Sequence, residues 1–284
     1  MPNSKIIRTT PETQADFVWV PPSGILGKLT AEAWERSRAL EKKRLAEGLA
    51  PDQGLVRASL ADALRRDNVA VIAEIKRRSP SKGAINPGLS AENQAMLYAA
   101  GGAAALSVLT EPTSFGGDNE DIASSRKAEL PLLKKDFHVS ELQLVEAEAL
   151  GASAALLIVR AIDPEHLSDL AEAARQIELE LLFEVRDERE LERALKAGAV
   201  MIGVNNRNLE TLVIDPETVS RVVPLIPSSC IAIAESGYST PEDVMRAAEA
   251  GADAVLVGSA LSASADPAAA VRQLANIPRQ SRRA

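Results

Sequence analysis

The sequence predicts an α/β protein, a (β/α)8 TIM barrel with an N-terminal helical extension. From about Val69 to the end of the chain, short apolar runs alternate with amphipathic stretches. Such alternation is typical of βα units and a parallel sheet. Glycines at regular spacing separate the amphipathic stretches from the apolar runs, and this repeat indicates which kind of parallel sheet forms.

Four segments share one pattern, in which a helix ends at a glycine and a buried strand follows at once. The glycines are Gly102, Gly151, Gly198 and Gly251, spaced 49, 47 and 53 residues apart. Each interval is about twice one βα unit, so a further strand is expected within each interval. The eight expected strands span residues 71–75, 104–108, 132–135, 154–159, 181–185, 200–204, 231–234 and 254–257.

Eight regular βα units favour a closed barrel over an open doubly wound sheet. The open sheet would also need a Gly-x-Gly-x-x-Gly turn after its first strand, and the sequence has none there. The expected organisation has four parts: a flexible N-terminal arm (1–24), a helical extension packing on the barrel (25–66), the catalytic barrel (67–276) and a frayed basic tail (277–284).

Charge and cysteine content narrow the function classes. The 284 residues carry a net charge of −8, which gives no general attraction for nucleic acid or an anionic membrane. The single cysteine, Cys230, cannot form an internal disulfide or a zinc cluster. No signal peptide or membrane-spanning run is recognisable. We therefore expect a cytoplasmic protein that has no nucleic-acid or membrane partner and binds any anion locally.

Polar side chains end five of the expected strands at one end of the barrel, where TIM-barrel active sites lie. Glu74 and Lys76 end the first strand and share one face, because side chains alternate along a strand. The others are Lys135, Glu184, Asn205 and Glu235. The opposite strand ends carry no comparable set, which favours a reaction site. Structural ion pairs at a barrel mouth are the alternative.

The loops after strands seven and eight predict a phosphate site. They contain Ser236 with Gly237 and Gly258 with Ser259. In many barrels these two loops bind phosphate, because glycine lets the backbone approach and helix-start N–H groups point at the anion. Ordinary turn formation is the alternative, since turns favour both residue types.

Two earlier loops suggest contacts with other parts of a ligand. The basic loop 77–83 contains Ser79 and suits either a mobile anion-contacting lid or a solvated run of charges. The next loop places Phe115 beside two glycines, which suits a wall for a flat substrate.

Acid–base chemistry falls to lysine and glutamate. His138 and His166 start helices, with His166 expected on the surface, and no cluster has metal-ligand spacing. A desolvated lysine has a lowered pKa and a carboxyl in an apolar pocket a raised one, so such a pair can exchange protons near neutral pH.

Five motifs in their family order resemble indole-3-glycerol-phosphate synthases. They are 72–83, 107–111 with 115–117, 134–137, 203–209 and 234–237. The resemblance covers about residues 69–275 and is only loose at 25–29. Tyr238 departs from the family, which more often has a smaller aliphatic residue there.

The resemblance implies an enzyme of tryptophan biosynthesis that needs no cofactor and no metal. Its small-molecule substrate would be 1-(2-carboxyphenylamino)-1-deoxyribulose 5-phosphate, which undergoes ring closure, decarboxylation and dehydration. By resemblance Lys135 is the acid on the ketone oxygen, and Glu184 and Lys76 share the dehydration in an order left open. The implied catalytic set is Glu74, Lys76, Lys135, Glu184, Asn205 and Ser236; the implied substrate-binding set is Ser79, Phe115, Phe137, Arg207, Glu235, Gly237, Gly258 and Ser259.

Two other functions stay open at this point. One is another phosphosugar barrel enzyme, of the phosphoribosylanthranilate isomerase type, and the other is a non-catalytic barrel that binds a ligand. The sequence shows no apolar seam between exposed helix faces, so it leaves both a monomer and a weak homodimer possible.

Overall fold

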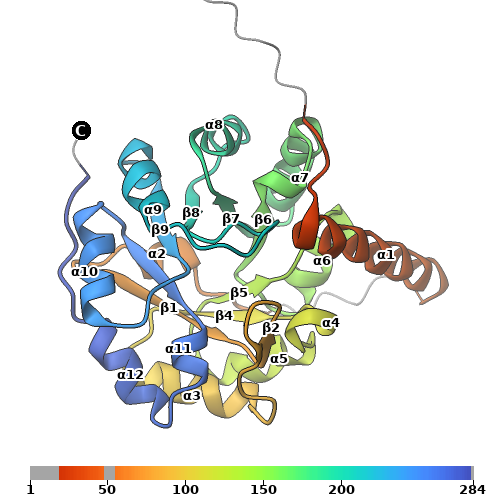
Figure 1. Ribbon diagram of the computed structural model, residues 1–284. Coiled ribbons are helices and arrows are strands. Elements are labelled where there is room, and N and C mark those ends of the chain that lie inside the picture. Colours follow the sequence, from red (N-terminus) through yellow and green to blue (C-terminus); the bar gives the residue numbers. More distant parts are fainter. Residues whose placement is uncertain (1–18, 48–54, 283–284) are drawn as a thin grey trace, which may run out of the picture.

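The computed structural model describes residues 19–47 and 55–282, and Figure 1 shows a ring of parallel strands surrounded by helices. The strands close in the order β1-β10-β9-β8-β7-β6-β5-β4. This confirms the (β/α)8 TIM barrel. The barrel strands are β1 (Ala70–Ile75), β4 (Ala105–Leu109), β5 (Leu132–Lys135), β6 (Ala154–Ile158), β7 (Glu180–Val185), β8 (Met201–Asn205), β9 (Ile231–Glu235) and β10 (Ala254–Val257).

Each barrel strand is apolar on both faces, because one face fills the barrel interior and the other meets the helices. All six residues of β1 and all five of β4 are buried. Each observed strand lies within one residue of its expected range at either end. Polar residues enter these strands mainly near their carboxyl ends, so the chain concentrates its chemistry on one rim.

Helices follow the barrel strands. They are α3 (Ala91–Gly101), α4 (Pro112–Phe115), α5 (Glu120–Ser125), α6 (Glu141–Ala149), α7 (Pro164–Gln176), α8 (Glu188–Lys196), α9 (Glu217–Val222), α10 (Pro241–Glu249), α11 (Ser259–Ser262) and α12 (Pro267–Leu274). Most of them cover the outside of the barrel, whereas the short α4 and α11 lie at the carboxyl ends of the strands. The single turns η1 (Arg126–Ala128), η2 (Val159–Ala161) and η3 (Val223–Leu225) follow α5, β6 and α9. None of the helices in the described residues is long and apolar enough to cross a membrane.

The four repeated glycines have the left-handed backbone that the sequence predicted. Their φ angles are +92° at Gly102, +89° at Gly151, +85° at Gly198 and +90° at Gly251. Residues with a Cβ rarely adopt this conformation, whereas glycine adopts it at little cost. Each glycine therefore ends its helix and turns the chain directly into the next strand.

The N-terminal extension consists of α1 (Gly24–Glu47) and the short α2 (Leu60–Leu64). α1 lies beside α6 in Figure 1 and buries Leu26, Leu29 and Ala33 on one face. Trp34 of α1 stacks on His166 of α7, with ring centroids 5.7 Å apart. His166 is thus half-buried against the extension, and the expectation of a plain surface position was wrong.

α2 packs at the opposite rim of the barrel. The backbone N–H of Leu60 donates to Glu180 Oε2 at 2.6 Å, and Ser59 Oγ donates to Glu180 Oε1 at 2.6 Å. Glu180 begins β7, so α2 covers the amino end of the barrel. The expected arm falls largely on residues 1–18, which lie outside the described residues, as do 48–54 between the two helices.

The expectation of a frayed C-terminal tail was wrong for residues 277–282. Val69 N donates to Ile277 O at 2.8 Å, and Arg279 N donates to Asp67 O at 2.9 Å. Arg279 and Arg282 both bind Asp253, at 2.8 and 2.7 Å. The basic residues are ordered because they neutralise a carboxylate buried at the start of β10. Residues 283–284 lie outside the described residues.

We expect Arg282→Met to lower the free energy of unfolding by about 2 kcal/mol, because Asp253 then keeps only one arginine. Turnover at 25 °C should not change, since this contact lies at the rim opposite the carboxyl ends of the strands. Urea unfolding followed by circular dichroism measures the difference. Arg272→Met, an exposed change on α12, is the matched control, and equal stabilities of the two variants would contradict the assignment.

Candidate active site

One cavity of about 280 Å³ lies at the carboxyl ends of the barrel strands. The structure brings together in its wall every site residue expected from the sequence. They are Glu74, Lys76, Ser79, Phe115, Lys135, Phe137, Glu184, Asn205, Arg207, Glu235, Ser236, Gly237, Gly258 and Ser259. Their arrangement shows which chemical steps the cavity can support.

A cluster of three carboxylates and two lysines forms the floor of the cavity. Lys135 Nζ lies 3.2 Å from Glu184 Oε2 and 3.5 Å from Glu235 Oε2. Lys76 pairs with Glu74 next to them. The three carboxylates are almost fully buried, whereas the two lysines keep contact with the cavity. The ammonium groups are therefore the charged groups best placed to meet a ligand.

Two glycines make room for these carboxylates. A Cβ on Gly203 of β8 would lie 2.1 Å from Glu235 Oε1, and a Cβ on Gly258 would lie 2.1 Å from Glu74 Oε1. Any side chain at either position would displace a carboxylate. Gly258 thus has a role besides the phosphate contact expected from the sequence. The absence of a side chain at Gly203 and at Gly258 leaves the space that the carboxylates of Glu235 and Glu74 occupy.

Asn205 orients the cluster from β8. Its Nδ2 donates to Glu184 Oε1 at 2.9 Å, and its Oδ1 accepts from the backbone N–H of Arg207 at 2.9 Å. Arg207 in turn donates from Nη1 to Leu212 O at 2.9 Å. Glu184 is therefore held between an amide on one oxygen and Lys135 on the other, which limits it to one rotamer.

The electrostatics of the cluster differ from the expectation of a lysine with a lowered pKa. Burial alone would lower the pKa of Lys135, but the negative charges of Glu184, Glu235 and Glu74 outweigh burial and raise it. Burial, reinforced by the other two carboxylates against the opposing effect of Lys135, raises the pKa of Glu235 to about 8. Glu235, expected only to line the site, thus titrates far above the usual range of a carboxyl group.

The aromatic wall and the helical extension form the apolar side of the cavity. The rings of Phe115 and Phe137 lie 6.3 Å apart between centroids and are tilted by 39°. Ile25, Leu26 and Leu29 of α1 also line the cavity, which the sequence reasoning missed. Their three- and four-residue spacing indicated a buried face but did not indicate what that face covers.

The loops after β9 and β10 form the opposite, polar side. Ser236 and Gly237 both have positive φ angles, +64° and +91°. Asn206 Nδ2 donates a hydrogen bond to Ser236 O at 3.1 Å. Gly258 precedes α11, which begins at Ser259. The first N–H groups of a helix have no acceptor within it, so these groups are available to an anion.

The basic first loop folds over the same cavity. Arg78 and Ser79 form β2, which pairs antiparallel with β3 (Gly83–Ala84). Ser79 Oγ accepts from Lys82 N at 3.2 Å, and Lys82 also lines the cavity. The loop is therefore a short hairpin against the site. Lys82 is a candidate ligand contact in the loop for which the sequence left two interpretations open, an anion-contacting lid and a solvated run of charges.

Fold and site together define a (β/α)8-barrel enzyme with a buried lysine–glutamate cluster between an aromatic wall and a polar rim. The family model for indole-3-glycerol phosphate synthase matches residues 26–274. The chain belongs to the indole-3-glycerol phosphate synthase family.

Individual relatives agree with this assignment. The chain is 47% identical over 232 residues to the indole-3-glycerol phosphate synthase of a Nocardioides species, covering 78% of this chain and 89% of that protein. It is 51% identical to the enzyme of Streptomyces griseus (75% and 79% covered) and 44% identical to that of Laribacter hongkongensis (89% and 99% covered). Of the three functions that the sequence left open, the family selects the first.

A solved structure shows the same fold in a more distant protein. Thiamine phosphate pyrophosphorylase from Pyrococcus furiosus superposes with a TM-score of 0.55 at 17% identity, covering 74% of this chain and 95% of that one. At this identity the likeness concerns the barrel alone.

The raised pKa of Glu235 predicts a pH dependence of stability. The unfolded chain binds this proton only below about pH 4.3, whereas the folded chain holds it up to about pH 8. The folded state binds more protons in this window, so its stability falls as pH rises through it. Glu235→Gln removes the titration. We expect its melting temperature to decrease less than that of the wild type between about pH 6 and about pH 9.

Circular dichroism melts of both proteins in one buffer series measure this difference. Subtracting the two curves removes the contributions of Glu190 and His138, whose pKa values burial also shifts, to about 7 and about 4. Parallel curves would mean that Glu235 is already ionised in the folded protein at the lower pH.

Proposed function

We propose that the cavity converts 1-(2-carboxyphenylamino)-1-deoxyribulose 5-phosphate into indole-3-glycerol phosphate. The observation that carries this proposal is Lys135, a protonated lysine among three carboxylates that faces the cavity beside the two phenylalanines. The chain is thus a carbon–carbon lyase, a carboxy-lyase of tryptophan biosynthesis. The substrate's aryl ring, ketone and phosphate each have a matching part of the cavity wall.

Ring closure requires a proton on the ketone oxygen as the aryl carbon attacks the ketone carbon. Lys135 supplies it, since its raised pKa keeps the ammonium charged at neutral pH and its side chain remains open to the cavity. The new carbon–carbon bond leaves positive charge next to the ring nitrogen. Loss of carbon dioxide from the same ring carbon returns the electron pair of the broken bond to the ring. Buried carboxylates nearby stabilise that positive charge.

Dehydration then requires the new hydroxyl to leave as water and a proton to be removed. Lys76 and Glu184 are the two groups assigned to these transfers. Both reach the cavity, and each is paired with another member of the cluster: Lys76 with Glu74, and Glu184 with Lys135. The cluster can return protons between steps because its members contact one another.

The remaining catalytic assignments are supporting ones. Glu74 holds Lys76, while Asn205 fixes the rotamer of Glu184. Ser236 lines the cavity directly after Glu235, where its strained backbone turns the chain away from the barrel. Arg207 and Ser79 contribute substrate contacts from the rim.

The two ends of the substrate are bound on opposite sides. Phe115 and Phe137 form the wall for the aryl ring. The backbone N–H groups at Gly237, Gly258 and Ser259 bind the phosphate, supported by the α11 N-terminus. Binding both ends aligns the ring carbon and the ketone of the one substrate molecule for attack, so the conformational freedom of its flexible chain is already lost before the bond forms.

We also propose the organisation and setting of the chain. Residues 67–276 form the catalytic barrel, and 25–66 form the extension that packs on it. The exposed large apolar side chains of the described residues are spread over several elements, with no more than two on any one of them, as with Met96 and Leu97 on α3. This dispersion supports a monomer or a weak homodimer, and the single cysteine supports a cytoplasmic setting.

Lys135→Ala should lower kcat by roughly 10²–10⁴-fold with a small change in KM, because it removes a proton donor that acts in the transition state. The assay supplies the substrate to purified protein in the presence of EDTA and follows indole fluorescence. Lys127→Ala, at an exposed ion pair on η1, is the matched control. Wild-type protein that folds but produces no fluorescence would refute the proposed reaction; an unchanged kcat in the variant would refute only the role of Lys135.

Ser259→Asp should raise KM by about tenfold or more, because a carboxylate at the start of α11 repels the substrate phosphate. Ser259→Ala is the control for loss of the hydroxyl and should change KM much less. Steady-state kinetics of both variants measure the effect. A KM that Asp leaves unchanged would place the phosphate elsewhere in the cavity.

A further inference from the structure

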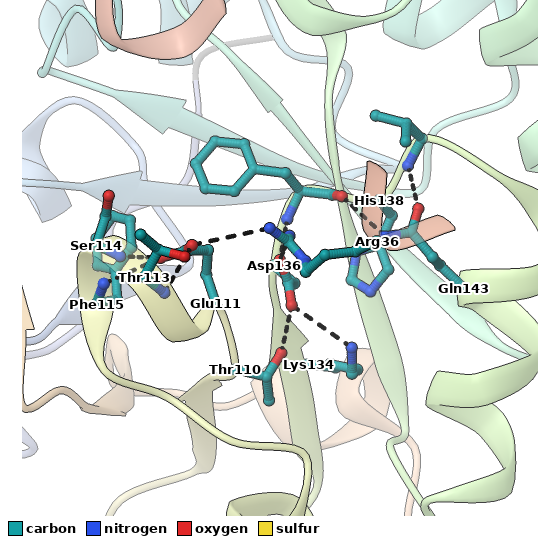
Figure 2. A network of polar contacts seen from close by, with 12 residues as sticks. Arg36, Thr110, Glu111, Thr113, Ser114, Phe115, Lys134, Asp136, His138 and Gln143 are labelled. Atoms are coloured by element: carbon teal, nitrogen blue, oxygen red, sulfur yellow. Dashed lines mark hydrogen bonds and ion pairs between the residues drawn. The ribbon is translucent and has the colours of Figure 1, made fainter. Parts of the chain in front are cut away.

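Arg36 of α1 lies between two buried carboxylates at the ends of neighbouring barrel strands, as Figure 2 shows. Its Nη2 donates to Asp136 Oδ1 at 2.7 Å, and its Nη1 lies 3.7 Å from Glu111 Oε1. Glu111 follows β4 and is completely buried, and Asp136 follows β5 and is 6% exposed. Two carboxylates this deep need compensating charge, and Arg36 supplies it to both.

Glu111 fixes the backbone that carries Phe115. It is the N-cap of α4 and accepts from Thr113 N at 3.0 Å, Ser114 N at 2.7 Å and Phe115 N at 3.0 Å. α4 has four residues and ends at Phe115, so it has few other internal hydrogen bonds. The orientation of Phe115 therefore depends on the position of the Glu111 carboxylate.

Asp136 fixes Phe137 in a similar way. Its Oδ1, which Arg36 contacts, also accepts from the backbone N–H of Phe137 at 2.7 Å. Its Oδ2 accepts from Thr110 Oγ1 at 2.8 Å and lies 3.7 Å from Lys134 Nζ. Burial alone would raise the pKa of Asp136, but Lys134 and Arg36 outweigh burial and hold it below its usual range. The carboxylate stays ionised and keeps its full hold on the Phe137 backbone.

We propose that Arg36 is a positioning residue for the aryl end of the substrate: it joins the two carboxylates that hold Phe115 and Phe137, and so sets the distance and tilt between the two rings. The proposal rests on the proposed function for the identity of the ligand. The ring geometry that it explains, 6.3 Å and 39°, belongs to the protein itself.

The shape of the arginine side chain suits this task. A guanidinium has a rigid planar fork and can address two acceptors at once, whereas the ammonium of a lysine is a single point charge. At the next residue the fold fixes α1 again, because Ser37 Oγ donates at 2.7 Å to Oγ of Ser140, the N-cap of α6. Arg36 thus occupies a defined place and links the extension to the aromatic wall.

A purely structural ion pair predicts a different result from a positioning role. If Arg36 only stabilised the fold, its loss would weaken binding of every ligand or lower the melting temperature without changing selectivity. If it positions the wall, its loss weakens binding of the aryl group and leaves the phosphate rim, on the far side of the cavity, unaffected. The aromatic contact binds substrate and transition state alike, so the effect should appear in KM more than in kcat.

The test compares wild type, Arg36→Met, Arg36→Lys and the control Arg38→Met, which removes an exposed arginine on the same helix. Steady-state kinetics give kcat and KM for the carboxyphenylamino-deoxyribulose phosphate. Inhibition by inorganic phosphate probes the phosphate rim alone, and thermal melts report on the fold. Arg36→Lys keeps the charge, so it serves as the milder variant if Arg36→Met is poorly folded.

We expect KM to rise about tenfold in Arg36→Met and about threefold in Arg36→Lys, with kcat within about threefold of the wild type and the phosphate inhibition constant within about twofold. Arg38→Met should match the wild type. An unchanged KM in Arg36→Met, with an active wild type, would overturn the positioning role and leave the proposed function intact. An equal fold-change in KM and in the phosphate inhibition constant of Arg36→Met would also overturn it. A wild type without turnover would overturn the proposed function, before any variant is considered.

Discussion

The structure depends on pairing three buried carboxylates with lysines at the carboxyl end of the barrel. Glu74, Glu184 and Glu235 are almost fully buried, and isolation of such charges from water costs several kcal/mol each unless partners compensate. Lys76 and Lys135 provide the compensation. The carboxylates raise the pKa of Lys135, while burial and the neighbouring carboxylates raise the pKa of Glu235 to about 8 against the opposing effect of Lys135.

This constraint explains features that would otherwise look unrelated. Gly203 and Gly258 are glycines because side chains there would displace the carboxylates of Glu235 and Glu74. Asn205 is an amide because Glu184 needs a donor on the oxygen that Lys135 does not reach. Apolar residues of α1 cover one side of the cavity. Electrostatic interactions are stronger where such a wall keeps water out.

The sequence could predict the strands and the site residues because both follow from local pattern. The alternation of apolar and amphipathic stretches, the glycines that end helices and the polar residues at strand ends can all be recognised in the sequence. The barrel topology then brings those strand ends to one rim. Contacts between distant residues were not visible in this way. Neither the partners of Arg282 and Arg36 nor the approach of α1 to the cavity has a local signal. The pKa of Lys135 was misjudged because its direction depends on how many carboxylates surround it, which only the closed barrel decides.

The two rims of the barrel divide stability from function. At the amino rim, Glu180 holds α2 and Asp253 holds Arg279 and Arg282, and these contacts seal the ends of β7 and β10 without facing the cavity. At the carboxyl rim the buried charges face the cavity. Barrels of this fold host many chemistries, so the strands alone do not determine the reaction. The N-terminal extension contributes to both rims. Its helix α2 stabilises the amino rim. Its helix α1 supplies part of the apolar wall of the cavity and, through Arg36, the charge that holds the aromatic residues in place. A helix added before the first strand has therefore become part of the site that the eight strands build.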